Sequence, residues 1–443
     1  MAIDSLPGKT DEFTASPSYR NYALWLLFVV YGLSYVDRQI LSMLMEPIRE
    51  EFNFSDLQLG LLSGVAFAIF YTTLGIPIAR LADRVNRVNI IAISLVVWSA
   101  ATALTGRAHG FFQLFFTRVA VGVGEAGCNP SAYSIISDYY PPKQRATVLS
   151  IYSLGVYLGQ FIGFIVVGYV ATAYGWRTAF YVVGLPGIAL AILVKLTLRE
   201  PPRGFSDPDY KPVEPPPMKM VLKKLLAKPA FCHLALAAGL HAFVAYGLNN
   251  YYSAYLMRSH GMSLTETSFA LAIITLVGGL SGTYLGGKLS DILSHRAGGD
   301  PRYQMWVPAI ALLINIPVWL LALMLPDRLA VLVLMIPAIA FGATYLGPSI
   351  AATHQLVGVR ERALGGAMLL LVLNLIGIGT GPMFTGFLSD QIRGYLLGQG
   401  VAESLALADG LRYALCLVSV ANLWSAYHYF RAARTLREDI ASG

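Results

Sequence analysis

The chain has 443 residues, of which 56% are hydrophobic and only 13% are charged. Ordinary soluble domains carry about 25% charged residues, so this composition excludes a soluble globular protein and indicates a chain that is integral to a membrane. The formal net charge of +7 does not indicate a nucleic-acid partner, because Lys and Arg gather in alternate loops of the predicted topology. That positive-inside bias predicts that both termini are cytoplasmic.

Twelve segments are apolar over the roughly 20 residues that a helix needs to cross a bilayer. They lie at 22–46, 56–78, 89–107, 111–136, 146–172, 177–198, 231–257, 267–290, 304–325, 329–352, 363–389 and 409–434. None shows the alternation of a barrel strand, so we expect α-helices, which satisfy their own backbone hydrogen bonds in lipid. The predicted fold class is therefore an all-α membrane protein with twelve transmembrane helices.

A polar stretch at 199–230, rich in proline and lysine, divides these segments into two sets. We interpret it as a cytoplasmic linker that ends in a short amphipathic helix. It separates an N-terminal six-helix bundle at 22–198 from a C-terminal six-helix bundle at 231–434. Residues 1–21 and 435–443 are interpreted as cytoplasmic tails.

The two halves resemble copies of one another. Ser55 with Gln58, and Ser263 with Glu266, form the capping-box pattern immediately before a span in each half. A glycine followed at a fixed spacing by a proline occurs at Gly124 and Pro130 and again at Gly342 and Pro348. Parallel repeats of this kind predict two bundles that rock about a site near the middle of the membrane, which favours a carrier over a channel.

Four charged residues fall inside predicted spans: Asp37, Arg38, Arg118 and Glu125. A charge at the membrane centre costs at least about 2.5–3.5 kcal/mol, and such residues usually pair and mark a transport path. From the helical rise we expect Asp37 and Arg118 at similar depth, with Arg38 able to reach Glu125. The alternative is a set of static salt bridges that fix helix packing.

A proton-coupling mechanism follows from these residue types. Burial favours the neutral form of the Asp37 and Glu125 carboxyl groups, and a nearby guanidinium opposes it, so the two acids are the predicted proton acceptors. Arg38 and Arg118 then become free to bind a phosphate or carboxylate headgroup, which suits the guanidinium fork. With no nucleotide site in the sequence, the energy source is expected to be a proton gradient, without a cofactor.

The second half lacks buried charges, and its spans present aromatic and amide side chains instead. The predicted cavity-lining residues are Tyr157, Tyr246, Asn249, Asn250 and Tyr345. His241 and His354 are expected to be packing or interface residues rather than proton relays. The three cysteines show no metal-ligand spacing, so no metal site is predicted.

The loop GIPIARLADRVNRVN (75–89) resembles the signature cytoplasmic loop of the major facilitator superfamily. The resemblance implies the major facilitator fold. Asp83, Arg84 and Arg87 would form a conformational clasp there, and Asp291 is the matching residue of the second half. An acid in this position can cap a helix N-terminus, and the arginines can hold carboxylates at helix ends together.

A set of ordered motifs resembles the Spinster branch of that superfamily: YVDRQIL (35–41), SDLQLGLLSGVAFAIFY (55–71), WSAATAL (98–104), GVGEA (122–126), GWRTAF (175–180) and EPPRG (200–204). The resemblance implies a proton-linked carrier of lysophospholipid or sphingosine-1-phosphate-like molecules. The expected partners are thus an amphipathic anion or lysolipid, protons and the lipid bilayer, and we expect a monomer in a bacterial plasma membrane.

Two other functions remain open. The D-R pair in the first span and G-E-A in the fourth also resemble organic-anion:cation symporters, which handle sugar acids with protons. A gradient-independent lipid scramblase or receptor with a carrier fold is the other alternative. No P-loop or nucleophile motif supports an enzyme.

Overall fold

The computed structural model describes residues 14–82, 84–207, 217–358 and 361–441, and all regular structure in these ranges is helical. Eleven helices in this part of the chain are long and apolar enough to cross a membrane. The predicted class, an all-helical multi-pass membrane protein, is confirmed.

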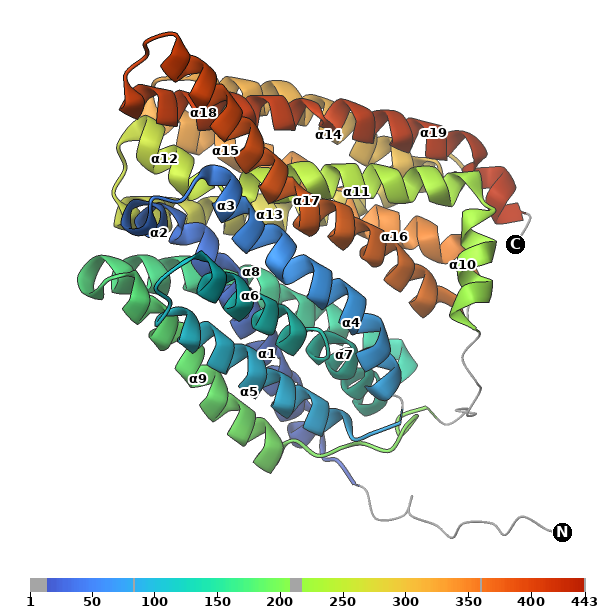
Figure 1. Cartoon of the computed structure of the whole chain (residues 1–443). Helices are drawn as coiled ribbons and strands as arrows, with labels where there is room; N and C mark the ends of the chain where they lie inside the picture. Colours follow the sequence, from blue (N-terminus) through green and yellow to red (C-terminus); the bar gives the residue numbers. More distant parts are fainter. Residues whose placement is uncertain (1–13, 83, 208–216, 359–360, 442–443) are drawn as a thin grey trace, which may run out of the picture.

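The N-terminal half occupies the lower part of Figure 1, coloured blue to green. Its described helices are α1 (Pro17–Met43), α2 (Met45–Phe52), α3 (Asp56–Gly60), the π-helical turn η1 (Leu61–Val65), α4 (Ala66–Ala82), α5 (Arg87–Thr105), α6 (Phe111–Glu125), α7 (Cys128–Tyr139), α8 (Pro142–Tyr174) and α9 (Trp176–Thr197). Within this half, α1 packs along α8, and α5 packs along α9 and α6.

The C-terminal half lies above it, coloured yellow-green to red (Figure 1). Its described helices are α11 (Pro229–Asn249), α12 (Tyr252–His260), α13 (Leu264–Arg296), α14 (Tyr303–Met324), α15 (Arg328–Ala343), α16 (Leu346–Gln355), α17 (Arg362–Gly398), α18 (Glu403–Val420) and α19 (Asn422–Ala441). A short helix, α10 (Met218–Leu226), precedes them and packs on α11 and α17 through Val221 and Leu225.

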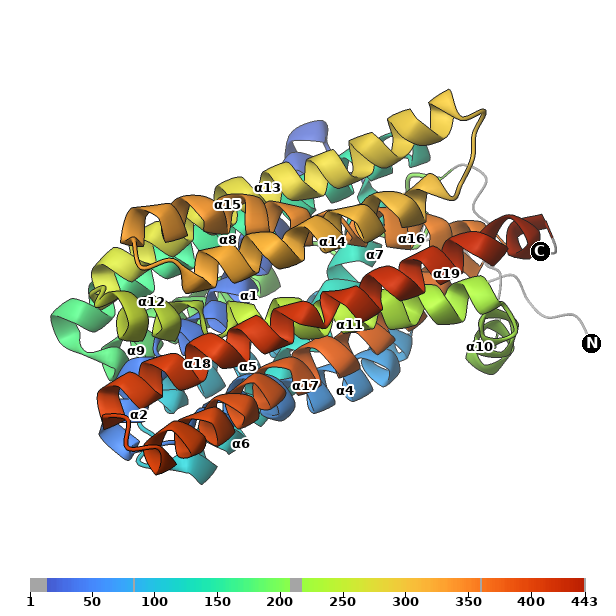
Figure 2. The same cartoon turned by 90° about the horizontal axis from the view of Figure 1, so that it is seen from above.

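The long helices run in roughly the same direction in both views (Figures 1 and 2). One end of the molecule holds α2, α3 and α12, and we call it the distal end. The opposite end holds the start of α1, helix α10 and the end of α19, and we call it the terminal end (Figure 1).

The predicted span at 111–136 is not one continuous helix. It is divided into α6 and α7 at Ala126 and Gly127, and neither of these two helices alone is among the eleven of spanning length in the described residues. Pro130 explains the break, because a proline cannot donate a hydrogen bond to the carbonyl four residues earlier and its ring crowds that carbonyl. Pro348 has the same relation to Thr344, where α15 ends and α16 follows.

The two halves meet along two seams. One joins α8 to α13, and the other joins α3, η1 and α4 to α17. The second seam is tight: a Cβ added at Gly60 would lie 2.3 Å from the backbone oxygen of Pro382, and one at Gly386 would lie 2.1 Å from that of Asp56. Glycine is therefore needed where the backbones approach this closely.

Both predicted capping boxes are confirmed. The Ser55 side chain accepts from the backbone N–H of Gln58, whose side chain in turn accepts from the backbone N–H of Ser55. Ser263 and Glu266 make the same reciprocal contacts at the start of α13. Each box satisfies backbone donors that the first turn of a helix leaves free.

Candidate functional site

A buried ion pair joins α1 to the break between α6 and α7. Arg38 donates from Nε to Glu125 Oε2 at 2.8 Å, and its Nη2 lies 2.7 Å from the same oxygen. The Glu125 side chain is 1% exposed, whereas that of Arg38 is 14% exposed. Glu125 is the last residue of α6, so Pro130 fixes its position by ending that helix.

Three aromatic rings surround the Arg38 guanidinium. Its Cζ lies 5.0 Å from the ring centre of Tyr35, 5.0 Å from that of Phe67 and 4.6 Å from that of Tyr71. These distances are within cation–π range, so the rings stabilise the charge of Arg38. The sequence analysis missed this cage, although Phe67 and Tyr71 are spaced one helical turn apart in α4.

Asp37 and Arg118 are also buried, at 0% and 2% exposed. They interact electrostatically but do not form an ion pair within 4.0 Å in the part of the chain that the structure describes. Neither Asp37 oxygen receives a hydrogen bond of normal geometry there, although Thr102 and Trp98 of α5 lie close. Of the four predicted charges, the structure thus pairs Arg38 with Glu125 directly and leaves Asp37 and Arg118 beside them.

One of the predicted cavity residues interacts with this ion pair, and two others lie near that residue or its neighbours. Tyr246 of α11 packs against the apolar cores of both halves and interacts with Arg38. Tyr345, between α15 and α16, lies within electrostatic range of Tyr246, Tyr157 and Tyr35. Tyr157 of α8 also shares a short hydrogen bond with Thr283 of α13, across the first seam. Tyr246 of the C-terminal half and Tyr35 and Tyr71 of the N-terminal half therefore meet beside Arg38.

The two asparagines end α11. Asn250 is 9% exposed and donates from Nδ2 to the backbone oxygen of Tyr246 at 2.9 Å. Asn249 is half-buried one residue earlier. The backbone N–H of Asn250 donates to the same Tyr246 oxygen at 3.2 Å, so the side chain adds a second hydrogen bond at the end of the helix.

The predicted clasp residues occupy different settings at the terminal end. Arg87 is 0% exposed and pairs with Asp138 of α7 and with Glu200, whose Oε1 lies 2.6 Å from Arg87 Nε. These contacts join the N-terminal half to the start of the linker and do not reach the C-terminal half. Arg84 and Asp291 are exposed, and neither forms an ion pair among the residues that the structure covers. Asp83 lies outside the described residues.

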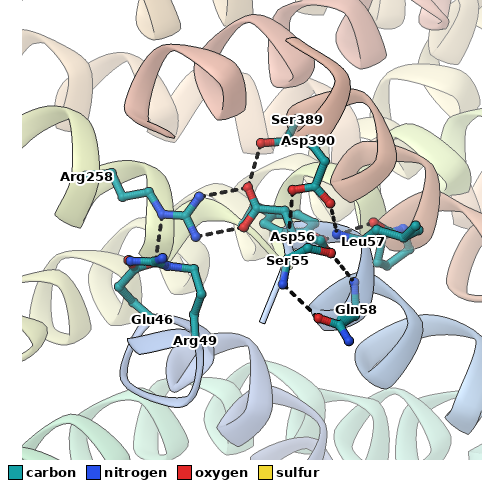
Figure 3. Close-up of polar contacts among 11 residues, drawn as sticks. Glu46, Arg49, Ser55, Asp56, Leu57, Gln58, Arg258, Ser389 and Asp390 are labelled. Carbon is teal, nitrogen blue, oxygen red and sulfur yellow. Dashed lines mark hydrogen bonds and ion pairs between the residues drawn. The ribbon is translucent and has the colours of Figure 1, made fainter. Parts of the chain in front are cut away.

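A buried polar cluster at the distal end joins the two halves (Figure 3). Arg258 of α12 donates to both oxygens of Asp56 at 2.8 Å and to Glu46 Oε2 at 2.7 Å. The three side chains are 4%, 1% and 5% exposed. We call this set the distal polar cluster: Glu46, Arg49, Asp56, Arg258, Ser389 and Asp390.

The other side of the distal polar cluster caps a helix across the seam. Asp390 of α17 accepts from the backbone N–H groups of Asp56 at 3.0 Å and Leu57 at 2.8 Å (Figure 3). Ser389 donates to Asp56 Oδ2 at 2.6 Å. A carboxylate at a helix N-terminus is stabilised by free N–H groups and by the helix dipole, so this contact adds to the Arg258 pair. The sequence analysis missed this cluster. The one sequence signal for it was the charged residue Asp56, which directly follows Ser55 of the capping box.

The fold and these buried charges together define a membrane transporter, because two packed helical halves with charged groups at their centre are typical of secondary carriers. The family model of the Major Facilitator Superfamily matches residues 27–299. The chain therefore belongs to that superfamily, whose members and named relatives point to transport rather than catalysis.

Three similar proteins refine this assignment. A crystal structure of a bacterial homologue of the human lysosomal transporter Spinster, in an inward-facing and unoccupied conformation, has a TM-score of 0.88, 36% identity, and coverage of 96% of this chain and 99% of that one. An MFS-type efflux pump of Mycolicibacterium smegmatis is 32% identical over 421 residues, 94% of each protein. Spinster homolog 1 of Xenopus tropicalis is 28% identical, covering 98% of this chain and 84% of its own. The predicted resemblance to Spinster is confirmed.

Proposed function

We propose that this chain is a proton-coupled secondary transporter of an amphipathic anion, such as a lysophospholipid or a sphingosine-1-phosphate-like molecule. It would work by alternating access as a monomer with twelve spans and cytoplasmic termini, in a bacterial plasma membrane. The observation that carries the proposal is the Arg38–Glu125 pair, which lies beside tyrosines of both halves.

The contact geometry of Arg38 supports a role in headgroup binding. Both close nitrogens point at one oxygen of Glu125, so this is not the two-oxygen fork that fully satisfies a guanidinium and a carboxylate. Arg38 is also the more exposed partner, at 14%. It therefore has donor capacity for a phosphate or carboxylate, while the surrounding rings can contact an apolar chain.

Protons would enter the cycle through Glu125 and Asp37. When Glu125 takes a proton, its attraction for Arg38 falls and the guanidinium can turn to an anionic headgroup. Asp37 is buried without a hydrogen bond to its carboxyl oxygens among the described residues, a setting that is costly for a charge. We assign Asp37 the protonated form in this conformation because its carboxyl group is fully buried without an ion pair in the described chain, and we assign Arg118 as its partner once it ionises.

The distal polar cluster supports alternating access. It ties the two halves at the distal end, which the predicted topology places outside the cell. The conformation would then be the one closed to the outside. The similar crystal structure of the Spinster homologue is itself inward-facing.

Uptake by purified protein in liposomes tests the function directly. Radiolabelled lysophospholipid with an anionic headgroup and radiolabelled glucuronate are offered separately, with and without an imposed pH gradient. Gradient-driven accumulation of the lysolipid supports the proposal. Accumulation of glucuronate instead would identify a sugar-acid symporter, and lysolipid equilibration that ignores the gradient would identify a scramblase. Protein-free liposomes are the control.

A further inference from the structure

A chain of buried hydrogen bonds crosses the C-terminal half and begins and ends on backbone oxygens. Asn315 of α14 donates from Nδ2 to the oxygen of Ala338 at 2.6 Å, and Asn422 of α19 donates from Nδ2 to Asn315 Oδ1 at 3.0 Å. His241 Nδ1 lies 3.0 Å from Asn422 Oδ1, and His241 Nε2 lies 2.8 Å from the oxygen of Gly342. The three side chains are at most 2% exposed.

The two backbone oxygens fix the direction of every bond in this chain. A carbonyl can only accept, so Asn315 must turn its Nδ2 to Ala338 and its Oδ1 to Asn422. Asn422 must then donate to Asn315, which turns its own Oδ1 to His241. Both nitrogens of the imidazole consequently face acceptors. A neutral imidazole has one N–H, whereas an imidazolium has two, so only the charged ring completes all four bonds.

One end of this hydrogen-bond chain lies at a helix break that corresponds to the break beside Glu125 in the other half. Gly342 is the second-last residue of α15, just before the break that Pro348 causes, as Glu125 is the last residue of α6 before the break that Pro130 causes. Asn422 is the first residue of α19, just after the break that follows α18. His241 therefore connects the interruptions of two helices to α11.

We propose that His241 is a proton-binding site of the C-terminal half. No Asp, Glu, Lys or Arg of the described chain lies within ion-pair range of its ring. Helices α14 and α19 contribute the side-chain amides of the hydrogen-bond chain that reaches the His241 ring. Helix α17 packs Ile376 and Val372 against the neighbouring turn of α11. Tyr345 is the titratable side chain in contact, with its ring edge-on to the imidazole at 4.5 Å.

Loss of the proton has a defined structural consequence. The neutral ring keeps one N–H for two acceptors, so the contact with either Asn422 or Gly342 must break. Burial opposes the charged ring and the two acceptors favour it, which makes the proton exchangeable. Because Tyr345 packs on the ring and lies near Tyr246, a change at His241 would reach the tyrosines beside Arg38. This inference goes beyond the proposed function and requires no particular substrate.

Nitrogen NMR of the full chain in lipid nanodiscs tests the proposal without a transport assay. The histidines are isotope-labelled, and His241 is assigned by its absence in His241→Gln, with His428→Gln as the matched control. We expect a ring with both nitrogens protonated at mildly acidic pH that loses one proton as the pH rises. A ring that is neutral from acidic to neutral pH overturns the proposal.

A second variant tests the donor count itself. In Asn315→Leu, Asn422 loses the oxygen that fixed its orientation, so its amide can turn and donate to a neutral ring. The His241 transition should then move to lower pH by about one unit, the scale of one changed hydrogen bond to a titrating group. An unchanged transition in a folded Asn315→Leu protein overturns the argument. If Asn315→Leu does not fold, the titration of His241 in the wild-type protein still decides whether this ring binds a proton. Failure of lysolipid uptake would leave these NMR outcomes intact, so the two proposals fail separately.

Discussion

Arg38 and Glu125 are joined through a single carboxylate oxygen. Nε and Nη2 of Arg38 lie 2.8 Å and 2.7 Å from Glu125 Oε2, while Oε1 has no hydrogen-bond partner in the described part of the chain. A pair held in this way can be separated at lower cost than a two-oxygen fork, since fewer bonds are lost. The same two residues can therefore be stable in one conformation and exchange partners in another.

Neutralising the two acids should abolish proton coupling. In Glu125→Gln and Asp37→Asn proteins, we expect pH-driven lysolipid accumulation to fall by about tenfold or more, because an amide side chain cannot take up or release a proton. Uptake in proteoliposomes across a range of imposed pH gradients measures this. Glu266→Gln is the control, because the Glu266–Arg328 pair is exposed. If both variants keep the pH dependence of the wild type, the coupling role assigned to these acids is wrong.

Removing Arg258 should open the distal end. Arg258→Ala leaves Glu46 and Asp56 buried without their shared cation, a change that costs about 3–5 kcal/mol. Spin labels at exposed Glu50 and Ser404, one in each half, report the distance between the halves by pulsed electron resonance. We expect a new, longer distance population in Arg258→Ala. Arg328→Ala should leave the distribution unchanged, since exposed pairs contribute about 0–1 kcal/mol. A single unchanged distance in both would show that the distal polar cluster does not hold the halves together.

The tight seam between α3 and α17 gives an independent test of the same closure. A methyl group at Gly60 would meet the backbone of Pro382 and Met383, which cannot move aside as a side chain could. Gly60→Ala should therefore lengthen the same spin-label distance and destabilise the protein by about 1–3 kcal/mol. Gly287→Ala has open space around its Cβ and should be neutral or slightly stabilising. Equal thermal midpoints for the two variants would contradict the packing described here.

Arg87 should be needed for stability of the N-terminal half rather than for proton coupling. Its buried guanidinium contacts Asp138, Ser134 and Glu200, so Arg87→Ala leaves both acids without their shared cation. We expect a clear drop in the thermal midpoint of the detergent-purified protein, and a smaller drop for Arg87→Lys. Exposed Arg84 supplies the control substitution, Arg84→Ala, which should leave the midpoint unchanged. A stable Arg87→Ala protein that transports without a pH gradient would instead assign Arg87 to coupling.

The turn between α13 and α14 provides a pH-insensitive reference. Burial of the Asp300 carboxyl would raise its pKa, but hydrogen bonds from Arg302 and Arg437 outweigh burial and hold the pKa at about 2. A depressed pKa contributes stability above the unfolded value near 3.9 and loses it as the pH falls toward about 2. Asp300→Asn should thus lower the thermal midpoint by the same amount from pH 5 to pH 8. If the drop in thermal midpoint changed between pH 5 and pH 8, the Asp300 carboxyl would titrate within that range, which would contradict its depressed pKa.

The candidate site was predictable in its components. A charge within an apolar span is unusual enough to be identified from sequence, so Asp37, Arg38, Arg118 and Glu125 needed no coordinates. Their pairing was only partly predictable, because helical rise gives depth but not the rotation of one helix against another. That rotation decides whether Asp37 lies close enough to Arg118 to form an ion pair. It also decides which aromatic rings surround Arg38.

The sequence by itself determined a helical membrane protein with two repeated halves and capping boxes at Ser55 and Ser263, since hydropathy and capping act over a few neighbouring residues. Only the tertiary structure decided that Arg258 reaches Asp56 across the halves, and that His241 faces acceptors on both sides. Those contacts join residues more than a hundred positions apart. Local spacing carries no information about them, because they depend on how whole helices pack.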